Sequence, residues 1–272
     1  MHPASAITKV REFSVYGVES VSHISLDQSG KLWISDNNEN LIQTDQQGNQ
    51  LQGDQLQRRI KTNGEDEGYH AVKQDGELVF TDRYKRVVNR ITVNNYIVKF
   101  IKTGDWEPIS VYSSHINGDI LVGMVKGKKA KITRYNKTGD KILDIQKKNL
   151  IQRLYGEPHY ITENQNGDIC VSDNDKEAVV VVNKSGHYRF SYRGQQEKFL
   201  PQGICTDALG HILVCDFYDS SIHLLDQDGQ FLFLLLKEQP GVSSPQCVCV
   251  DKDDNLYVGK NMHTTVTVYK YL

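Results

Sequence analysis

Three histidines at similar places in the chain are the side chains best suited to binding a metal ion. His23, His70 and His159 each begin a short, largely apolar stretch. If these stretches lie side by side around an axis, the imidazoles can converge, and three of them can hold zinc with one coordination position open. Gln202 and Gln246 occupy the corresponding places further along, and a mixed set of His and Gln is more typical of a polar channel lining. We therefore expect these five residues to line a narrow channel without a bound metal.

A second set of residues combines positive charge with aromatic rings. Cations that hold phosphates and rings that stack on bases are the combination that single-stranded RNA recognition uses. The same residues would also suit a protein-binding surface or an ordinary solvated one, and these interpretations stay open. The set consists of Arg83, Tyr84, Lys85, Arg86, Trp106, Lys126, Lys128 and Lys129, with Phe217 and Tyr218 in a comparable polar segment.

Four aspartates recur at the ends of apolar runs: Asp36, Asp82, Asp173 and Asp216. A ring of carboxylates would suit acid–base catalysis, but an active site rarely needs the same group four times. An aspartate that ends a strand readily accepts hydrogen bonds from the amides of the following loop. We interpret the four as loop caps and assign no catalytic residue. The nucleophile motif G-x-S-x-G and the C-x-x-C pair are also missing from the chain.

The elements that must position these side chains form an internal repeat. Its copies are SGKLWISD, DGELVFTD, NGDILVGM, NGDICVSD, LGHILVCD and DDNLYVGK, whose second residues are numbers 30, 76, 118, 167, 210 and 254. Each copy joins a short strand to a second, β-rich run through a polar turn, and two further strands follow. Glycine and Asn/Asp at the turns suit the positive φ angles of tight hairpins. A unit of four strands in about 40–45 residues is typical of a propeller blade.

The sequence therefore predicts an all-β, six-bladed β-propeller with four antiparallel strands in each blade. The last unit supplies only three strands, at 246–250, 255–259 and 265–269, so we expect residues 9–15 to add the fourth and close the ring. Residues 1–272 then form a single domain. Its blades cover approximately residues 16–60, 61–104, 105–148, 149–194, 195–238 and 239–272, plus the closing strand.

Blade geometry assigns every connection to one of two faces. The turns after the first and third strands lie on one face, which we call the turn face. The loops after the second strands and the connections between blades lie on the other, the loop face. The cationic and aromatic residues fall on the loop face, where variable loops stand on a rigid scaffold. We expect binding there.

Two segments, PQGICTDALGHILVCD at 201–216 and PHYITENQNGDICVSD at 158–173, resemble the NHL repeat. The whole chain is similar to the C-terminal NHL propellers of tripartite-motif proteins, notably the divergent invertebrate ones. Met124 and Lys260 depart from the pattern, which has aspartate there. The resemblance implies a non-catalytic recognition module that binds a protein partner. It would recognise substrates of a ubiquitin ligase if RING, B-box and coiled-coil segments precede it. Some relatives bind RNA on the loop face, which keeps RNA as the alternative.

Two propeller enzymes provide a third alternative. An amidating lyase of this fold binds zinc through channel histidines, and a lactonase holds calcium among oxygen ligands. The first strands here supply His, Gln, Ile and Cys instead of an oxygen-rich set. Only Glu107 and Glu157, each directly before a proline, are candidates for a calcium cage.

Composition restricts the partners. The net charge of −2 argues against DNA binding through bulk charge. All five cysteines lie in apolar stretches, which predicts free thiols in a reducing compartment. The longest apolar run, FLFLLL, is too short to cross a membrane, and the first residues show no secretory signal. We expect a cytoplasmic protein with no cofactor, no DNA and no membrane partner, and the oligomeric state stays open.

Overall fold

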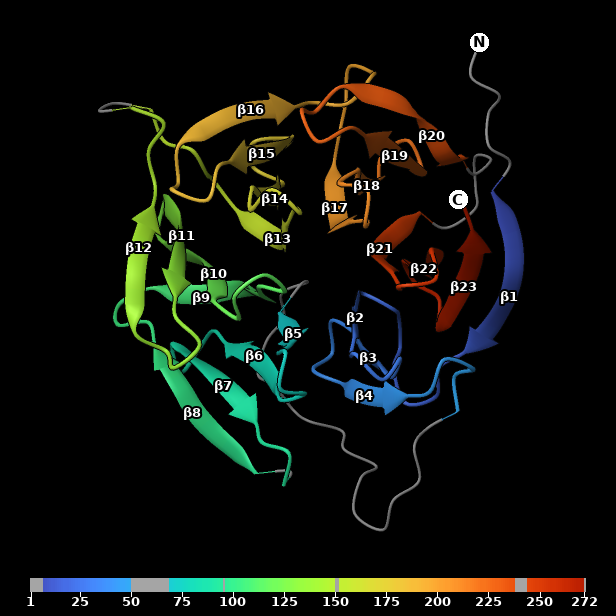
Figure 1. The fold of residues 1–272 in the computed structure, drawn as a ribbon, viewed down its shortest axis with the longest axis horizontal. Coiled ribbons are helices and arrows are strands. Elements are labelled where there is room, and N and C mark those ends of the chain that lie inside the picture. Colours follow the sequence, from blue (N-terminus) through green and yellow to red (C-terminus); the bar gives the residue numbers. More distant parts are fainter. Residues whose placement is uncertain (1–6, 50–68, 95, 150–151, 238–243, 272) are drawn as a thin grey trace.

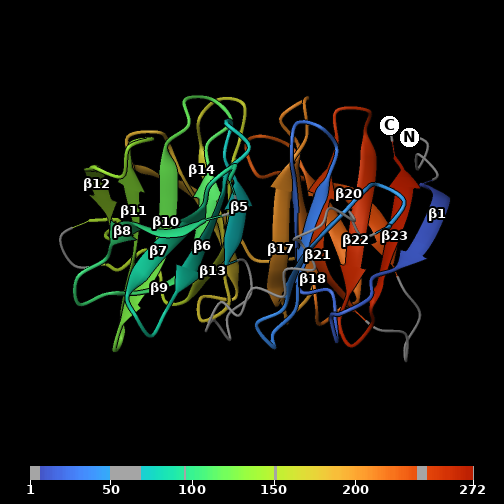
Figure 2. The ribbon, with the colours of Figure 1, turned by 90° about the horizontal axis from the view of Figure 1, so that it is seen from below.

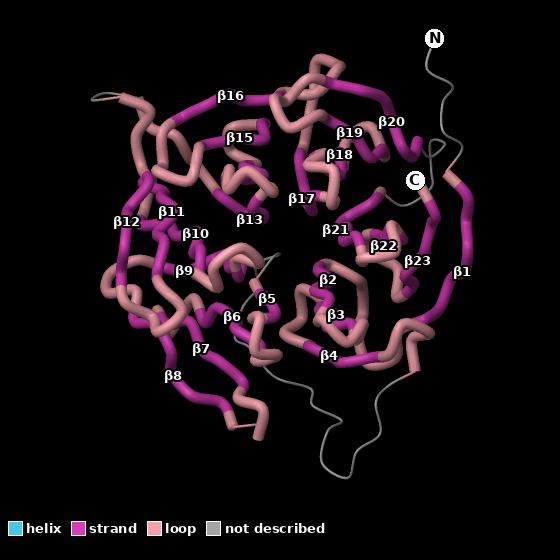
Figure 3. The backbone as a smooth tube through the Cα atoms, viewed as in Figure 1, coloured by secondary structure: helices cyan, strands magenta, loops and turns pink. Residues whose placement is uncertain are grey.

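A computed structural model describes residues 7–49, 69–94, 96–149, 152–237 and 244–271. The described residues form twenty-three strands joined by turns and loops, without a helix (Figure 3). The strands are β1 Thr8–Ser14, β2 His23–Leu26, β3 Leu32–Ser35, β4 Leu41–Thr44, β5 His70–Val72, β6 Leu78–Asp82, β7 Val87–Ile91, β8 Ile97–Lys102, β9 Glu107–Ser113, β10 Ile120–Lys126, β11 Lys129–Tyr135, β12 Lys141–Ile145, β13 Pro158–Glu163, β14 Ile169–Asp173, β15 Ala178–Val182, β16 Tyr188–Tyr192, β17 Pro201–Thr206, β18 Ile212–Asp216, β19 Ser221–Leu225, β20 Phe231–Lys237, β21 Pro245–Val250, β22 Asn255–Lys260 and β23 Thr265–Lys270.

Six antiparallel sheets stand in a ring around a central axis (Figure 1). Blades 2 to 5 are β5–β8, β9–β12, β13–β16 and β17–β20, with the first strand of each nearest the axis. Blade 1 contains β2, β3 and β4 in the described chain. Residues 50–60, where its fourth strand is expected, lie outside the described residues. The chain is a six-bladed β-propeller, and the predicted fold is confirmed.

The ring is closed by the N-terminal strand. Blade 6 has the order β1-β23-β22-β21, and β1 runs antiparallel to β23 from Thr8 opposite Lys270 to Ser14 opposite Thr265. Figure 1 shows the blue first strand beside the red last one. Side chains reinforce the pairing, because Phe13 packs against the apolar cluster between blades 6 and 1. The predicted closing strand is therefore confirmed, one residue earlier than expected.

The core lies between neighbouring sheets. Each blade packs its apolar side chains against the next, so the β-branched and aromatic positions of the repeat are buried. The backbones of blades 5 and 6 approach each other closely at Gly203. A Cβ at Gly203 would stand 2.5 Å from the Cα of Cys247, so only glycine fits there. The five cysteines are free thiols, as predicted.

Strands run between the two faces, and the connections gather at the two ends (Figure 2). Turn-face hairpins follow one local rule. The Asp27 carboxylate accepts hydrogen bonds from the amides of Ser29 and Lys31, and Gly30 takes a φ of 85°. The rule explains why the polar turns recur at a constant place in every repeat. Within the described residues, no helix is long and apolar enough to span a membrane.

Candidate binding sites in the channel and on the loop face

Two of the three predicted channel histidines meet at the loop-face end of the channel. The rings of His23 and His70 are 4.4 Å apart and edge to face. His23 Nε2 lies 3.0 Å from the carbonyl oxygen of His70, and the Ser25 hydroxyl lies 2.9 Å from His70 Nδ1. Burial lowers the pKa of His23 to about 4 and that of His70 well below its ordinary value. Both imidazoles are therefore neutral near pH 7.

His159 does not join them. His23 is paired with the fourth residue of β3, whereas His70 is paired with the third residue of β6. In blade 4 the fourth residue of β14 is paired with Tyr160, and His159 lies at the register irregularity between Pro158 and Tyr160. Its Nε2 lies 3.4 Å from the carboxylate of Glu157. Within the described residues, no group of three or more His, Cys, Asp or Glu side chains is placed to hold a metal ion.

A tyrosine crosses the channel at the same end. The Tyr160 hydroxyl donates a 2.7 Å hydrogen bond to the carbonyl oxygen of Ser22, which lies on the opposite side of the ring. Its ring stands 5.5 Å from that of His23. Gln202 and Gln246 are buried, and the amide of Gln246 donates to the side-chain oxygen of Gln202 over 3.3 Å. Hydrogen bonds thus join several polar groups at this end, although His23 Nδ1 is buried without a hydrogen-bond partner among the described residues.

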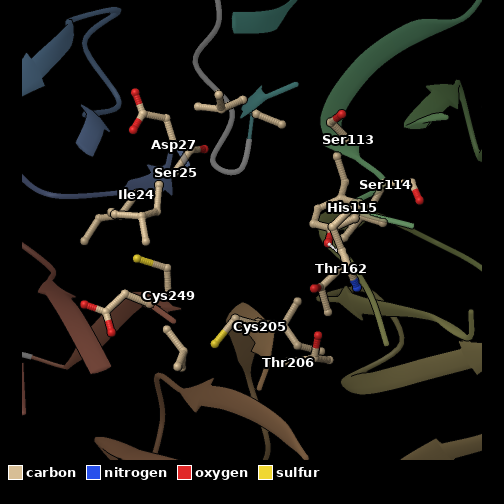
Figure 4. Close-up of a pocket in the computed structure, with 18 of the residues that line it drawn as sticks. Ile24, Ser25, Asp27, Ser113, Ser114, His115, Thr162, Cys205, Thr206 and Cys249 are labelled. Atoms are coloured by element: carbon tan, nitrogen blue, oxygen red, sulfur yellow. Dashed lines mark hydrogen bonds between the residues drawn. The ribbon is translucent and has the colours of Figure 1, made fainter. Parts of the chain in front are cut away.

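The channel widens toward the turn face into a cavity of about 500 Å³. Small polar side chains and two thiols from the first strands line it (Figure 4): Ser25, Thr162, Cys205, Thr206 and Cys249. His23 and His70 belong to its wall, whereas His159, Gln202 and Gln246 are not among its lining residues. Burial raises the pKa values of both thiols, so neither is a reactive thiolate. The sequence predicted no cavity at this end.

The recurring aspartates hold the loops of the loop face. Asp36 accepts hydrogen bonds from the amides of Asn38 and Asn40 in its own loop, and from Glu19 in the connection that precedes the blade. The same two-sided arrangement occurs at Asp173 and Asp216. Asp82 accepts from the amide of Lys85 in its own loop. The interpretation as loop caps is confirmed. The sequence did not reveal that Asp36, Asp173 and Asp216 also fix the incoming connection, because that contact joins distant segments.

One buried imidazole was not singled out from the sequence. His223 is 2% exposed, with Nδ1 2.7 Å from the Tyr192 hydroxyl and Nε2 3.0 Å from that of Ser221. Burial lowers its pKa to about 4. The sequence signal that could have identified His223 is its place in the middle of an apolar third strand, SIHLL.

We expect His223 to make folding stability depend on pH. Between its unfolded pKa near 6.5 and its folded pKa, the unfolded chain binds more protons, so stability falls as pH decreases. The loss between pH 6.5 and 4 should approach about 3 kcal/mol. Urea unfolding at pH 7 and pH 5 should show a smaller pH effect in His223→Gln than in wild type. The exposed His187→Gln is the control, and equal slopes for all three proteins would contradict the prediction.

Carboxylates neutralise part of the predicted cationic set on the loop face. Arg83 pairs with Glu107 at 2.9 Å, and Lys85 pairs with Asp82 at the same distance. Trp106 is half-buried, with the ammonium group of Lys131 4.5 Å above its ring. The remaining members differ in exposure and contacts: Tyr84 and Tyr218 are 66% and 58% exposed, Phe217 is half-buried, Arg86, Lys128 and Lys129 are exposed, and Lys126 pairs with Asp105.

The tertiary structure adds cations that sequence reasoning missed. Lys147 and Arg153 face each other in a short hairpin bridge between blades 3 and 4. The guanidinium of Arg153 donates a 2.7 Å hydrogen bond to the carbonyl oxygen of Lys128. This contact brings the hairpin, with Lys148, beside the turn between β10 and β11. The paired lysines at 147 and 148 were the only sequence signal.

Comparison with known proteins rests on structure. No family model matches the chain, and no curated protein sequence matches it. Virginiamycin B lyase from Staphylococcus aureus is 14% identical with a TM-score of 0.66, over 96% of this chain and 99% of that one. XC5397, a gluconolactonase from Xanthomonas campestris, is 15% identical with a TM-score of 0.69, over 100% and 93%.

A chain of the nidogen–laminin complex is 15% identical with a TM-score of 0.61, over 85% of this chain and 80% of that one. The likeness to all three is one of fold. Enzymes and a protein complex share it, so function must be inferred from the sites of this chain.

Proposed function

We propose that the chain is a non-catalytic recognition domain that binds a protein partner through its loop face. The proposal rests on one observation. The side chains that could act in catalysis form hydrogen bonds with other groups of the protein. His23 and His70 bond within the channel, and aspartates such as Asp36 are saturated by loop amides. The loops that they hold present exposed side chains, including Tyr84 and Tyr218, from a rigid base. Pre-ordered loops lose little conformational entropy on binding.

The NHL-like segments at 158–173 and 201–216 support the finer form of this proposal. In that form the domain selects substrates for a tripartite-motif-type ubiquitin ligase, whose other domains would lie outside this chain. The nidogen–laminin complex shows a similar fold within an assembly of two proteins.

The two alternatives have weaker support. Zinc would need His23, His70 and His159 together, but the third histidine stands apart beside Glu157. A calcium cage from Glu107 and Glu157 would have to displace Arg83 from the first carboxylate and His159 from the second. For RNA, three of the predicted cations, Arg83, Lys85 and Lys126, already pair with carboxylates on the protein.

Exposed aromatic and apolar residues on the two faces provide a matched test. We expect Tyr84→Ser with Tyr218→Ser to lose a set of proteins that wild type captures from extracts of its source cells. Tyr96→Ser with Leu209→Ser is the control, because these turn-face residues are 70% and 68% exposed. Quantitative mass spectrometry after RNase treatment is the measurement. Equal capture by both variants, or release of the set by RNase, would overturn the proposal.

A further inference from the structure

We propose that a cationic surface at the junction of blades 3 and 4 binds an acidic segment of a partner protein. This inference rests on the proposed function, since it names the part of the loop face and the chemistry of the partner. The surface, here called the cationic cluster, consists of six exposed residues: Lys126, Lys128, Lys129, Lys147, Lys148 and Arg153.

The first half of the cluster is the hairpin turn between β10 and β11. Lys126 stands directly opposite Lys129 across a turn of two residues. Like charges in directly opposed positions destabilise a hairpin. Asp105 offsets one of them, at 3.0 Å from Lys126. Among the described residues, no carboxylate forms an ion pair with Lys129.

The second half repeats the unfavourable arrangement. Lys147 is bridged to Arg153, so two cations again face each other across a hairpin. The hydrogen bond from Arg153 to the Lys128 carbonyl joins the two halves into one surface. These positive charges repel one another, since each added cation raises the electrostatic energy of the group. An anion bound from outside would relieve that repulsion, and carboxylates make strong charge-assisted hydrogen bonds with such donors.

The aromatic rings near the cluster favour a protein partner over RNA. The ammonium group of Lys131 lies 4.5 Å from the ring centre of Trp106, and that of Lys148 lies 3.6 Å from that of Tyr188. Lysines thus occupy the ring faces on which bases would stack. The two hairpins present exposed ammonium and guanidinium groups, which suit the carboxylates of an extended acidic peptide.

The test is fluorescence anisotropy with a labelled peptide of ten glutamates. We expect wild type to bind it with an affinity that falls severalfold between 50 and 200 mM salt. The triple change Lys128→Glu, Lys129→Glu and Arg153→Glu should weaken binding about tenfold or more. The matched control replaces Lys31, Lys137 and Lys184, three exposed residues of the turn face, with glutamate. Its affinity for the peptide should stay within about twofold of that of wild type.

A second readout separates this site from mere surface charge. Lys129→Glu replaces a like-charged pair with an opposite-charged one, so its thermal midpoint should equal or exceed that of wild type while peptide binding falls. Equal loss of binding in the turn-face control would overturn the inference. So would binding of a ten-nucleotide oligouridylate as tight as that of the peptide. If the cluster variant loses no peptide affinity while the Tyr84 and Tyr218 variant loses its captured proteins, this inference fails and the proposed function stands.

Discussion

A chain that begins at Val15 should fail to form a stable ring. The deletion removes β1, which supplies six paired positions to β23 and packs Phe13 against the neighbouring blade. It also removes the Arg11 hydrogen bond to the Tyr257 hydroxyl and exposes the unpaired edge of β23. We expect a loss of more than about 5 kcal/mol, which is comparable to the whole stability of many domains. Urea unfolding followed by circular dichroism would measure it.

A chain that begins at residue 7 is the control, because it keeps β1. A synthetic peptide of residues 7–15, added at high concentration, should restore part of the stability of the shorter chain by mass action. If the chain lacking β1 unfolds at the same urea concentration as the control, the N-terminal strand does not close the ring energetically.

Arg134→Met should be the most damaging single substitution on the turn-face side. Arg134 and Glu163 are 8% and 1% exposed, and their ion pair joins blade 3 to blade 4. Arg134 also contacts Asp119 at 3.3 Å and donates to the carbonyl oxygen of Lys184. Removing one partner of a buried pair leaves an uncompensated charge, which typically costs about 3–5 kcal/mol.

The double variant Arg134→Met, Glu163→Gln tests that explanation. It removes the stranded carboxylate charge, so it should be more stable than Arg134→Met alone in urea unfolding. The Ser114 hydroxyl, which donates to Glu163, can still donate to the glutamine. A further loss of stability in the double variant would show that packing, not buried charge, explains the effect.

The two ends of the channel differ in structure, and this difference bears on the proposed function. At the loop-face end, Tyr160 donates a hydrogen bond across the channel, and His23 Nε2 lies at hydrogen-bond distance from the carbonyl oxygen of His70. His23 Nδ1, by contrast, is buried without a hydrogen-bond partner in the part of the chain that the structure describes. At the turn-face end a cavity lies open, lined by protonated thiols and hydroxyls. Recognition is therefore best sought on the loops around the ring, where Asp36 and its counterparts hold the connections in place.

Local chemistry made much of this fold predictable. The turn from Asp27 to Gly30 depends on hydrogen bonds within four residues, so its pattern can be read in any copy of the repeat. The last unit of the repeat supplies only three strands, which identified β1 as the fourth strand of that blade. The N-terminal segment belongs to no other unit, so this pairing closes the ring. The loop-capping role of Asp36 also follows from contacts within its own loop.

The sites depended on contacts that join distant segments. Whether His159 meets His23 was decided by the strand pairing of blade 4, where a register irregularity puts Tyr160, and not His159, at the position that corresponds to His23. The place of Arg153 beside Lys128 depends on how a blade connection folds back on its neighbour. By itself the sequence determined the ring of blades, its closure and its loop caps, because these arise from short-range hydrogen bonding and alternation. Only the tertiary structure decided which histidines meet and which cations gather, because those outcomes depend on register and packing between segments far apart in the chain.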